Sequence, residues 1–122
     1  MAQGELVPLV LVPRYTSFVG ASAFVTIAMD VTEYQSAILN VWRGKLTGTT
    51  PTVGLTFQES SDQVNWTTCA GTNVNGYDPG QETEGQSTVT LGKKWFRVEV
   101  LLGGTTPAGT CWAVGFLEQR LS

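Results

Sequence analysis

Histidine is absent from this chain of 122 residues, which removes much of ordinary enzyme chemistry. Histidine is the commonest general base, a frequent metal ligand and the usual partner of a nucleophilic serine or cysteine. Cysteine is scarce, since only Cys69 and Cys111 occur, and two isolated cysteines without histidine do not form a zinc site. The sequence therefore predicts no catalytic set, no metal and no cofactor, and we expect a protein that is not an enzyme.

Charge is also low. Charged residues make up 14% of the chain, against roughly 25% in an average soluble domain, and the net charge is −3. No run of Lys or Arg forms a basic stripe, which argues against a nucleic-acid partner. A surface with so few charges is typical of a protein that neighbours cover, although a polar surface of Ser, Thr, Asn and Gln left in water explains it equally well.

Long apolar runs are missing too. No stretch approaches the ~18 uninterrupted apolar residues of a membrane span, so no membrane partner is expected. The first residues carry Glu5 where a secretory signal has a basic flank, so we expect synthesis in a cytoplasm without a signal peptide. In that compartment Cys69 and Cys111 are expected to be buried, reduced thiols rather than a disulfide.

What the chain does contain is glycine, threonine and valine in patterns of period two, which are typical of strands and turns. The clearest pattern is a hairpin over residues 52–69, with a polar turn at residues 60–63 and a second strand that Trp66 closes. In the first strand the alternating apolar residues share one face: Val53, Leu55 and Phe57.

Similar alternation predicts strands over residues 23–31, 37–47, 87–91, 95–102 and 110–121. Residues 103–109 are expected to form a flexible hairpin loop, and residues 70–86 a long acidic loop. The predicted fold is all-β, a single antiparallel β-sandwich or jelly-roll-like domain of about eight strands over residues 15–122. The inward faces of two strands are expected to be Val25, Ile27 and Met29, and Phe96, Val98 and Val100.

The first 14 residues are predicted to form an N-terminal arm or an edge strand. Pro8 and Pro13 cannot donate to a ladder and are tolerated mainly on edges. The apolar residues of this segment cannot all face one core, so we expect part of it to pack on another subunit. The candidate partner-binding residues here are Leu6, Val7, Leu9, Val10, Leu11 and Val12.

Two other features have a functional and a structural interpretation. Glu59 and Asp62 are close enough in sequence to suggest a glycosidase pair, but carboxylates in a tight turn usually serve solvation and local hydrogen bonding. Tryptophan rings on one flat face would indicate sugar stacking, but each lies in or beside a predicted strand, which favours core or interface packing. The four are Trp42, Trp66, Trp95 and Trp112.

Residues 58–66, QESSDQVNW, resemble a hairpin that recurs in small β-sandwich structural proteins of tailed bacteriophages. In those proteins a strand ends in a Ser-x-Asp-Gly-like turn followed by Asn-Trp, and Gln63 stands where the turn often has glycine. Residues 94–100 (KWFRVEV), the Gly/Thr/Pro stretch after them and residues 112–116 (WAVGF) are similar to the paired closing strands of the same proteins. The resemblance covers about residues 37–121.

This resemblance implies a virion component made in a host bacterial cytoplasm. It implies most directly a capsid decoration or cement protein that binds the outside of a phage head, with the major capsid protein or other virion subunits as partners. Self-association, for instance as a trimer at lattice three-folds, is a further expectation. The alternatives are a neck or tail accessory protein, or a carbohydrate-binding module on the virion. Outside the arm, the candidate contact residues are Ser61, Asp62, Tyr77 and Asp78.

Overall fold

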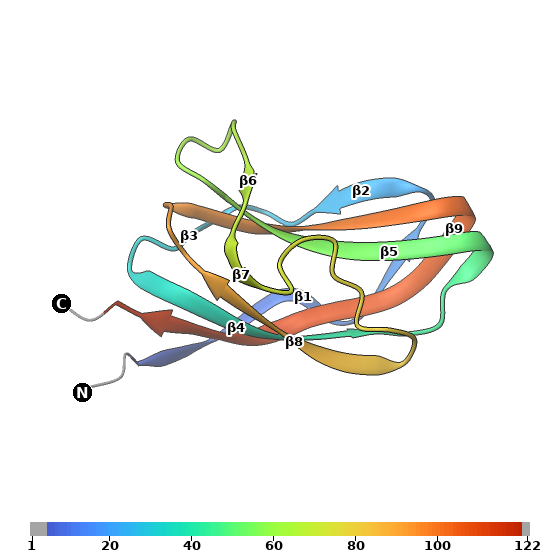
Figure 1. The fold of residues 1–122 in the computed structure, drawn as a ribbon, viewed down its shortest axis with the longest axis horizontal. Helices are drawn as coiled ribbons and strands as arrows, with labels where there is room; N and C mark the ends of the chain where they lie inside the picture. Colours follow the sequence, from blue (N-terminus) through green and yellow to red (C-terminus); the bar gives the residue numbers. More distant parts are fainter. Residues whose placement is uncertain (1–4, 121–122) are drawn as a thin grey trace.

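The computed structural model describes residues 5–120, and these residues form β-strands joined by turns and short irregular segments (Figure 1). Every pairing between strands is antiparallel. The all-β, antiparallel character that the sequence predicts is therefore confirmed. The strands are β1 (Leu6–Val19), β2 (Ser22–Val25), β3 (Met29–Asp30), β4 (Tyr34–Arg43), β5 (Thr47–Ser60), β6 (Thr67–Thr68), β7 (Ala70–Thr72), β8 (Thr83–Thr90) and β9 (Trp95–Gln119).

Strand β9 organises the sheet. It is 25 residues long, and β1, β2 and β3 follow one another along one of its sides. Strands β4 and β5 pair with it one after the other and form its other neighbours in the sheet. Strand β9 bends in its middle and β5 bends near its start, so one half of the sheet lies over the other, with the start of β1 and the end of β9 away from the bend (Figure 1).

The prediction of a flexible hairpin loop at residues 103–109 is wrong. These residues belong to β9 and stay in the ladder, where Ala108 pairs with Val19 on one side and with Thr47 on the other. A strand that is paired with a neighbour on each side can change direction without leaving the sheet. The Gly/Thr/Pro composition therefore marks a bend inside a strand rather than a loop between two strands.

The bend depends on a repeated tetrapeptide. Gly-Thr-Thr-Pro occurs at residues 48–51 in β5 and again at residues 104–107 in β9, and Thr49 pairs with Thr105. Both glycines have positive φ, +114° and +107°, and the second threonine of each copy has φ near +47°. The two adjacent strands therefore turn the same corner with the same local conformation.

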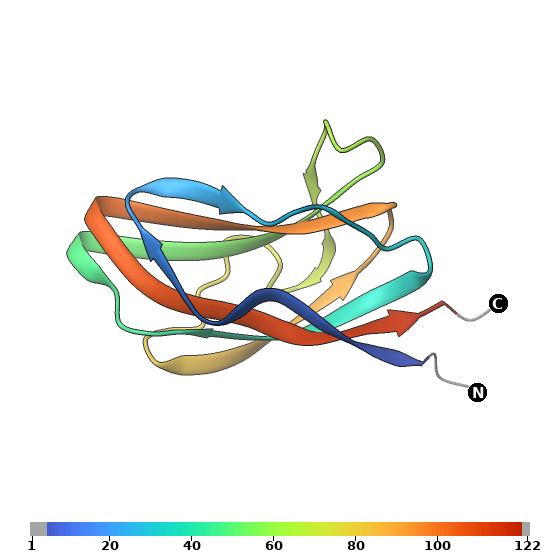
Figure 2. The same ribbon diagram turned by 180° about the vertical axis from the view of Figure 1, so that it is seen from behind.

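Away from β9 the sheet nearly closes on itself. On one flank β8 pairs with β4, and β7 pairs with β8. On the other flank β6 pairs with β5, and residues 74–77 reach β5 through hydrogen bonds of 2.8 Å from Phe57 N to Val74 O and 2.9 Å from Leu55 N to Tyr77 O. The result is a nearly closed, barrel-like sheet whose open side lies between β1 and the β2–β3 edge (Figure 2).

The core fills the space between the two halves. The domain is as compact as a typical monomer of its size: its total accessible surface is 6553 Å², close to the roughly 6,400 Å² expected for 13.1 kDa. The inward rows predicted for two strands are confirmed. They are Val53, Leu55 and Phe57 in β5 and Phe96, Val98 and Val100 in β9, all buried.

The inward orientation predicted for residues 23–31 is confirmed for Met29 but wrong for Val25 and Ile27, which are 50% and 92% exposed. Thr26 N donates to Val98 O, whereas Met29 pairs with Phe96, so three steps along this segment match two along β9. The extra residue is a bulge and shifts the alternation by one position. Phe24 and Met29 consequently face the core.

Residues 70–86 are less irregular than predicted, since they contain β7 and the first half of β8. Alternation fails here because polar side chains bonded to backbone carbonyls, rather than an apolar row, make the attachment. Ser87 Oγ donates to Asn73 O at 2.8 Å and Asn73 Nδ2 donates to Gln86 O at 2.9 Å. These bonds tie the two ends of the segment together.

Residues 1–4 of the predicted N-terminal segment lie outside the described residues, and the rest of it, from Leu6 on, is an edge strand of the domain rather than a separate arm. Strand β1 pairs with β9 from Leu6 to Val19, with a bulge between Val12 and Thr16 that holds Pro13, and Thr16 Oγ1 donates to Pro13 O at 2.6 Å. Its inward residues are buried in the chain's own core: Leu9, Leu11 and Val12.

Candidate interaction surfaces

No cluster of acidic residues and cysteines within residues 5–120 has the arrangement of a metal site. Cys69 and Cys111 are free and buried, as the sequence predicts. Burial raises the pKa of each thiol to about 12, and the charge of Glu59 adds to the effect at Cys69. Both therefore remain protonated near neutral pH and are poor nucleophiles.

The carboxylates considered as a glycosidase pair have local structural partners. Glu59 accepts a hydrogen bond of 2.9 Å from Gly92 N. Asp62 accepts from the backbone N–H groups of Asn65 and Val64 at 2.9 and 2.8 Å, and these bonds hold the pKa of its carboxyl well below the usual range. Both side chains thus stabilise a turn, which is the structural interpretation of the sequence pattern.

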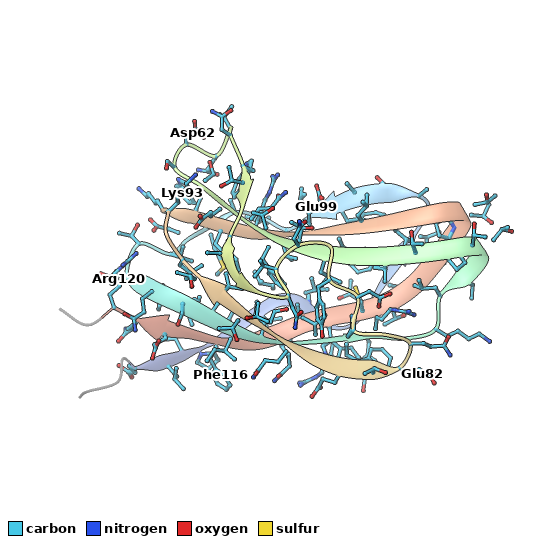
Figure 3. All side chains as sticks on the ribbon, viewed as in Figure 1. Asp62, Glu82, Lys93, Glu99, Phe116 and Arg120 are labelled. Carbon is cyan, nitrogen blue, oxygen red and sulfur yellow. The ribbon has the colours of Figure 1, made fainter. Side chains whose placement is uncertain are left out.

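Residues 61–66 form a loop that projects from one end of the molecule, with Asp62 near its tip (Figure 3). Ser60 is buried at its base and accepts from Gln63 N at 2.8 Å, and Gln63 has a φ of +62°. The position where the turn often has glycine therefore does adopt the left-handed conformation. At the tip, Val64 is 77% exposed. We call residues 61–66 the projecting loop.

Two candidate contact residues from the acidic segment are anchored within the chain. Tyr77 pairs through its backbone with Leu55 and packs against the core, and Gly85 leaves room for its hydroxyl group. Asp78 Oδ1 accepts a hydrogen bond of 2.7 Å from Arg43 Nε. Together with the bond from Gly80 N, it keeps the pKa of the Asp78 carboxyl low despite partial burial. Both residues primarily fasten their segment to the sheet.

The tryptophan rings have neighbours against them. Trp42 stacks on Trp112 with centroids 4.3 Å apart, and the ring of Tyr15 meets Trp112 edge-on at 5.3 Å. The two other rings are covered by cations: the Arg97 guanidinium carbon lies 4.0 Å from the centroid of Trp66, and Lys94 Nζ lies 5.3 Å from that of Trp95. This arrangement favours packing over a flat platform for sugars.

An exposed apolar surface lies on the outside of the half formed by β1, β9 and β4. Phe116 pairs with Pro8 on one side and with Ile38 on the other, and Val114 beside them pairs with Val10. Val10 is 61% and Phe116 45% exposed. We call these five residues the outer apolar face; Figure 3 shows Phe116 on the side of the molecule opposite Asp62.

A second apolar feature lies at the open side of the barrel. A groove of about 500 Å³ separates β1 from the segment that joins β2 to β3. Its lining contains no charged side chain, and Ile27 at its rim is 92% exposed. We call this the edge groove, and it is lined by Val10, Leu11, Val25, Thr26, Ile27, Ala28 and Met29.

The candidate contact residues therefore do not form one site. Of the N-terminal set, Leu6, Val7 and Val10 keep some exposure, while Ser61 and Asp62 lie on the projecting loop. Sequence reasoning missed Phe116 and Ile27. Phe116 faces outward in the alternation of its strand, so it could have been found, whereas Ile27 is outward only because of the bulge.

No protein-family model matches this chain, and no curated protein matches it. Within residues 5–120 there is no helix long and apolar enough to cross a membrane.

Proposed function

We propose that this chain is a non-enzymatic virion structural protein of the β-sandwich type, which binds the outside of a phage head as a decoration or cement protein. The observation that carries the proposal is the outer apolar face on an otherwise compact domain. A compact monomer seldom leaves adjoining apolar residues on one sheet face uncovered unless a partner uses them. The resemblance of residues 37–121 to phage structural proteins supports the choice of partner.

The outer apolar face is suited to passive docking. Its central residue, Phe116, has apolar neighbours on both adjacent strands, Pro8 and Ile38. Fully burying a Phe side chain contributes roughly 1.5–3 kcal/mol, so covering the half that is still exposed contributes about 1 kcal/mol. One such contact is weak, but a shell subunit held at several contacts gains from their effective concentration.

The mode of attachment differs from an arm that reaches onto a neighbour. Leu9 and Val12 lie in the core of the domain, so β1 cannot leave β9 without exposing them. The domain therefore docks as a rigid body, with the part of the outer apolar face around Phe116 against the shell. In this mode the chain stabilises the lattice by adding buried area at joints between capsid subunits.

The test begins with mass spectrometry of purified virions, in which the chain is expected as a structural component, followed by cryo-electron microscopy to locate it. Purified chain should then cosediment with heads that lack it, and Phe116→Asp should abolish binding at a temperature where the variant is still folded. Val64→Asp, on the projecting loop, is the matched control and should bind as the unmodified chain does. Density on the neck or tail would replace the head assignment, and absence from virions would refute the proposal.

A further inference from the structure

The edge groove lies where the barrel-like sheet fails to close. Strand β1 pairs on one side with β9, as do β2 and β3, and within the described residues their opposite sides have no strand partner. The segment 26–28 lies between β2 and β3, and its bulge turns Ile27 outward. This open side combines unpaired strand edges with an apolar lining, which proteins normally cover or protect with charge.

We propose that the edge groove binds a second copy of this chain, giving a two-fold symmetric dimer. The first reason is that the patch contains both halves of a contact. Ile27 protrudes at the rim and the groove lies directly beside it, so two copies related by a two-fold axis can each place Ile27 in the groove of the other. A two-fold interface uses the same patch on both partners and therefore requires this kind of self-complementarity.

The second reason is the distribution of charge. Each copy carries a net charge of −3, so two copies meet with least repulsion where neither has a charged side chain, as in the edge groove. Charges do occur beyond its two ends. Arg14 follows the groove residues along β1, and Asp30 follows Met29 along β3. Within the chain, Asp30 Oδ2 lies 3.9 Å from Lys94 Nζ in an exposed ion pair, and the Arg14 guanidinium carbon lies 5.8 Å from the ring centroid of Trp112. Exposed contacts of this kind are weak, so both charges can still attract a partner copy.

The positions of Arg14 and Asp30 make the two ends complementary. Strands β1 and β3 both run antiparallel to β9, but they pair with opposite sides of its bend and therefore run in opposite directions across the groove. Arg14 consequently lies at the bend end and Asp30 at the other end. A two-fold axis that crosses the groove exchanges its ends, and so brings Arg14 of one copy to the same end as Asp30 of the partner copy.

The contact consists of one groove of about 500 Å³ and its rim, so we expect it to bury less than the roughly 800 Å² per partner of a standard interface. The dimer is therefore expected to be weak, with a Kd in the micromolar range. Its formation does not depend on docking to a phage head. Phe116→Asp, which tests that docking, should leave the dimer intact.

Sedimentation velocity of the full chain over a concentration series tests the dimer. The mass should rise with concentration from 13.1 kDa towards twice that value. Ile27→Asp should raise the dimer Kd by at least about tenfold, since it places a charge in an apolar contact. Val64→Asp is the matched control and should dimerise normally. A monomer at millimolar concentration, a trimer as the limiting species, or an unimpaired Ile27→Asp dimer would each overturn the proposal.

A charge exchange tests the two-fold arrangement, and the unfolding midpoint of each variant is measured alongside, because Asp30 Oδ1 also accepts hydrogen bonds from Thr32 N and Thr32 Oγ1. Arg14→Glu and Asp30→Arg should each weaken the dimer because each places like charges together at both ends of the groove. The double variant should restore the Kd to within a few-fold of the original value. A double variant weaker than either single one would exclude this arrangement.

Discussion

Gly48 and Gly104 occupy equivalent places in two adjacent strands, and each faces the backbone of the other's tetrapeptide. A Cβ atom on Gly48 would lie 2.7 Å from Thr106 O, and one on Gly104 would lie 2.7 Å from Thr50 O. Both contacts are too close for a real side chain. The corner on which the two halves of the sheet turn therefore requires glycine for its conformation and for its space.

Replacing either corner glycine should destabilise the fold more than replacing Gly20, which has a positive φ but open space around it. Gly48→Ala and Gly104→Ala combine positive φ with a clash against a carbonyl group, so each should lower the free energy of unfolding by at least about 2 kcal/mol. Gly20 is the matched control, because its φ is +93° but a Cβ would meet nothing within 4 Å. Gly20→Ala should cost about 1 kcal/mol in urea unfolding. Equal losses at the three positions would disprove the steric role of the corner.

The core should respond to truncation according to burial. Leu39 in β4 is fully buried and Leu101 in β9 is 54% exposed, so the pair isolates burial at constant chemistry. Leu39→Ala should lower the free energy of unfolding by about 2–5 kcal/mol because it leaves a cavity. Leu101→Ala should cost less than about 1 kcal/mol in the same chemical denaturation. A comparable loss at Leu101 would show that its outer surface is covered in solution.

The projecting loop should be coupled to the sheet through Trp66 and Arg97. A double-mutant cycle with Trp66→Ala and Arg97→Ala should give a coupling energy of roughly 0.5–1 kcal/mol, typical of a partly exposed cation–π contact. Glu99→Ala with Trp66→Ala is the control cycle and should show additive losses. If the first cycle is additive as well, the contact does not hold the loop.

The same loop should keep its structure in mild acid. The pKa of the Asp62 carboxyl is depressed below the ordinary 3.8 by the N–H groups of Asn65 and Val64, so the stabilisation is present above that value and is lost only as the pH falls through the lower folded value. Carboxyl-carbon NMR should therefore give a titration midpoint below 3.8. The amide signals of Val64 and Asn65 should shift at the same pH, and in Asp62→Asn this transition should disappear. A midpoint at or above 3.8 would contradict these hydrogen bonds.

The two thiols should not react with thiol reagents in the folded protein. With the pKa of Cys69 and Cys111 raised to about 12, less than one thiol in a thousand is ionised near pH 8, and both are buried. A thiol reagent at pH 8 should therefore detect neither in the native chain and both after unfolding in guanidinium chloride. Rapid native labelling of either thiol would indicate local opening near that cysteine.

Sequence alone determined the class of fold and the inward rows of the strands that keep strict alternation. Val53, Leu55 and Phe57 repeat at period two and have paired neighbours, so the pattern decides which face is buried. The absence of histidine and the isolation of the cysteines likewise restrict the chemistry that the chain can support, whatever its fold. Residue types and local patterns suffice for these conclusions.

Tertiary structure decided where the chain bends and what it leaves exposed. The Gly-Thr-Thr-Pro repeat is visible in the sequence, but whether it makes a loop or a corner depends on β1 and β5 holding both sides of β9. Ile27 faces outward because one extra residue opposite β9 shifts the alternation. Register between distant strands sets both outcomes, and a local pattern carries no information about how many residues the partner strand uses.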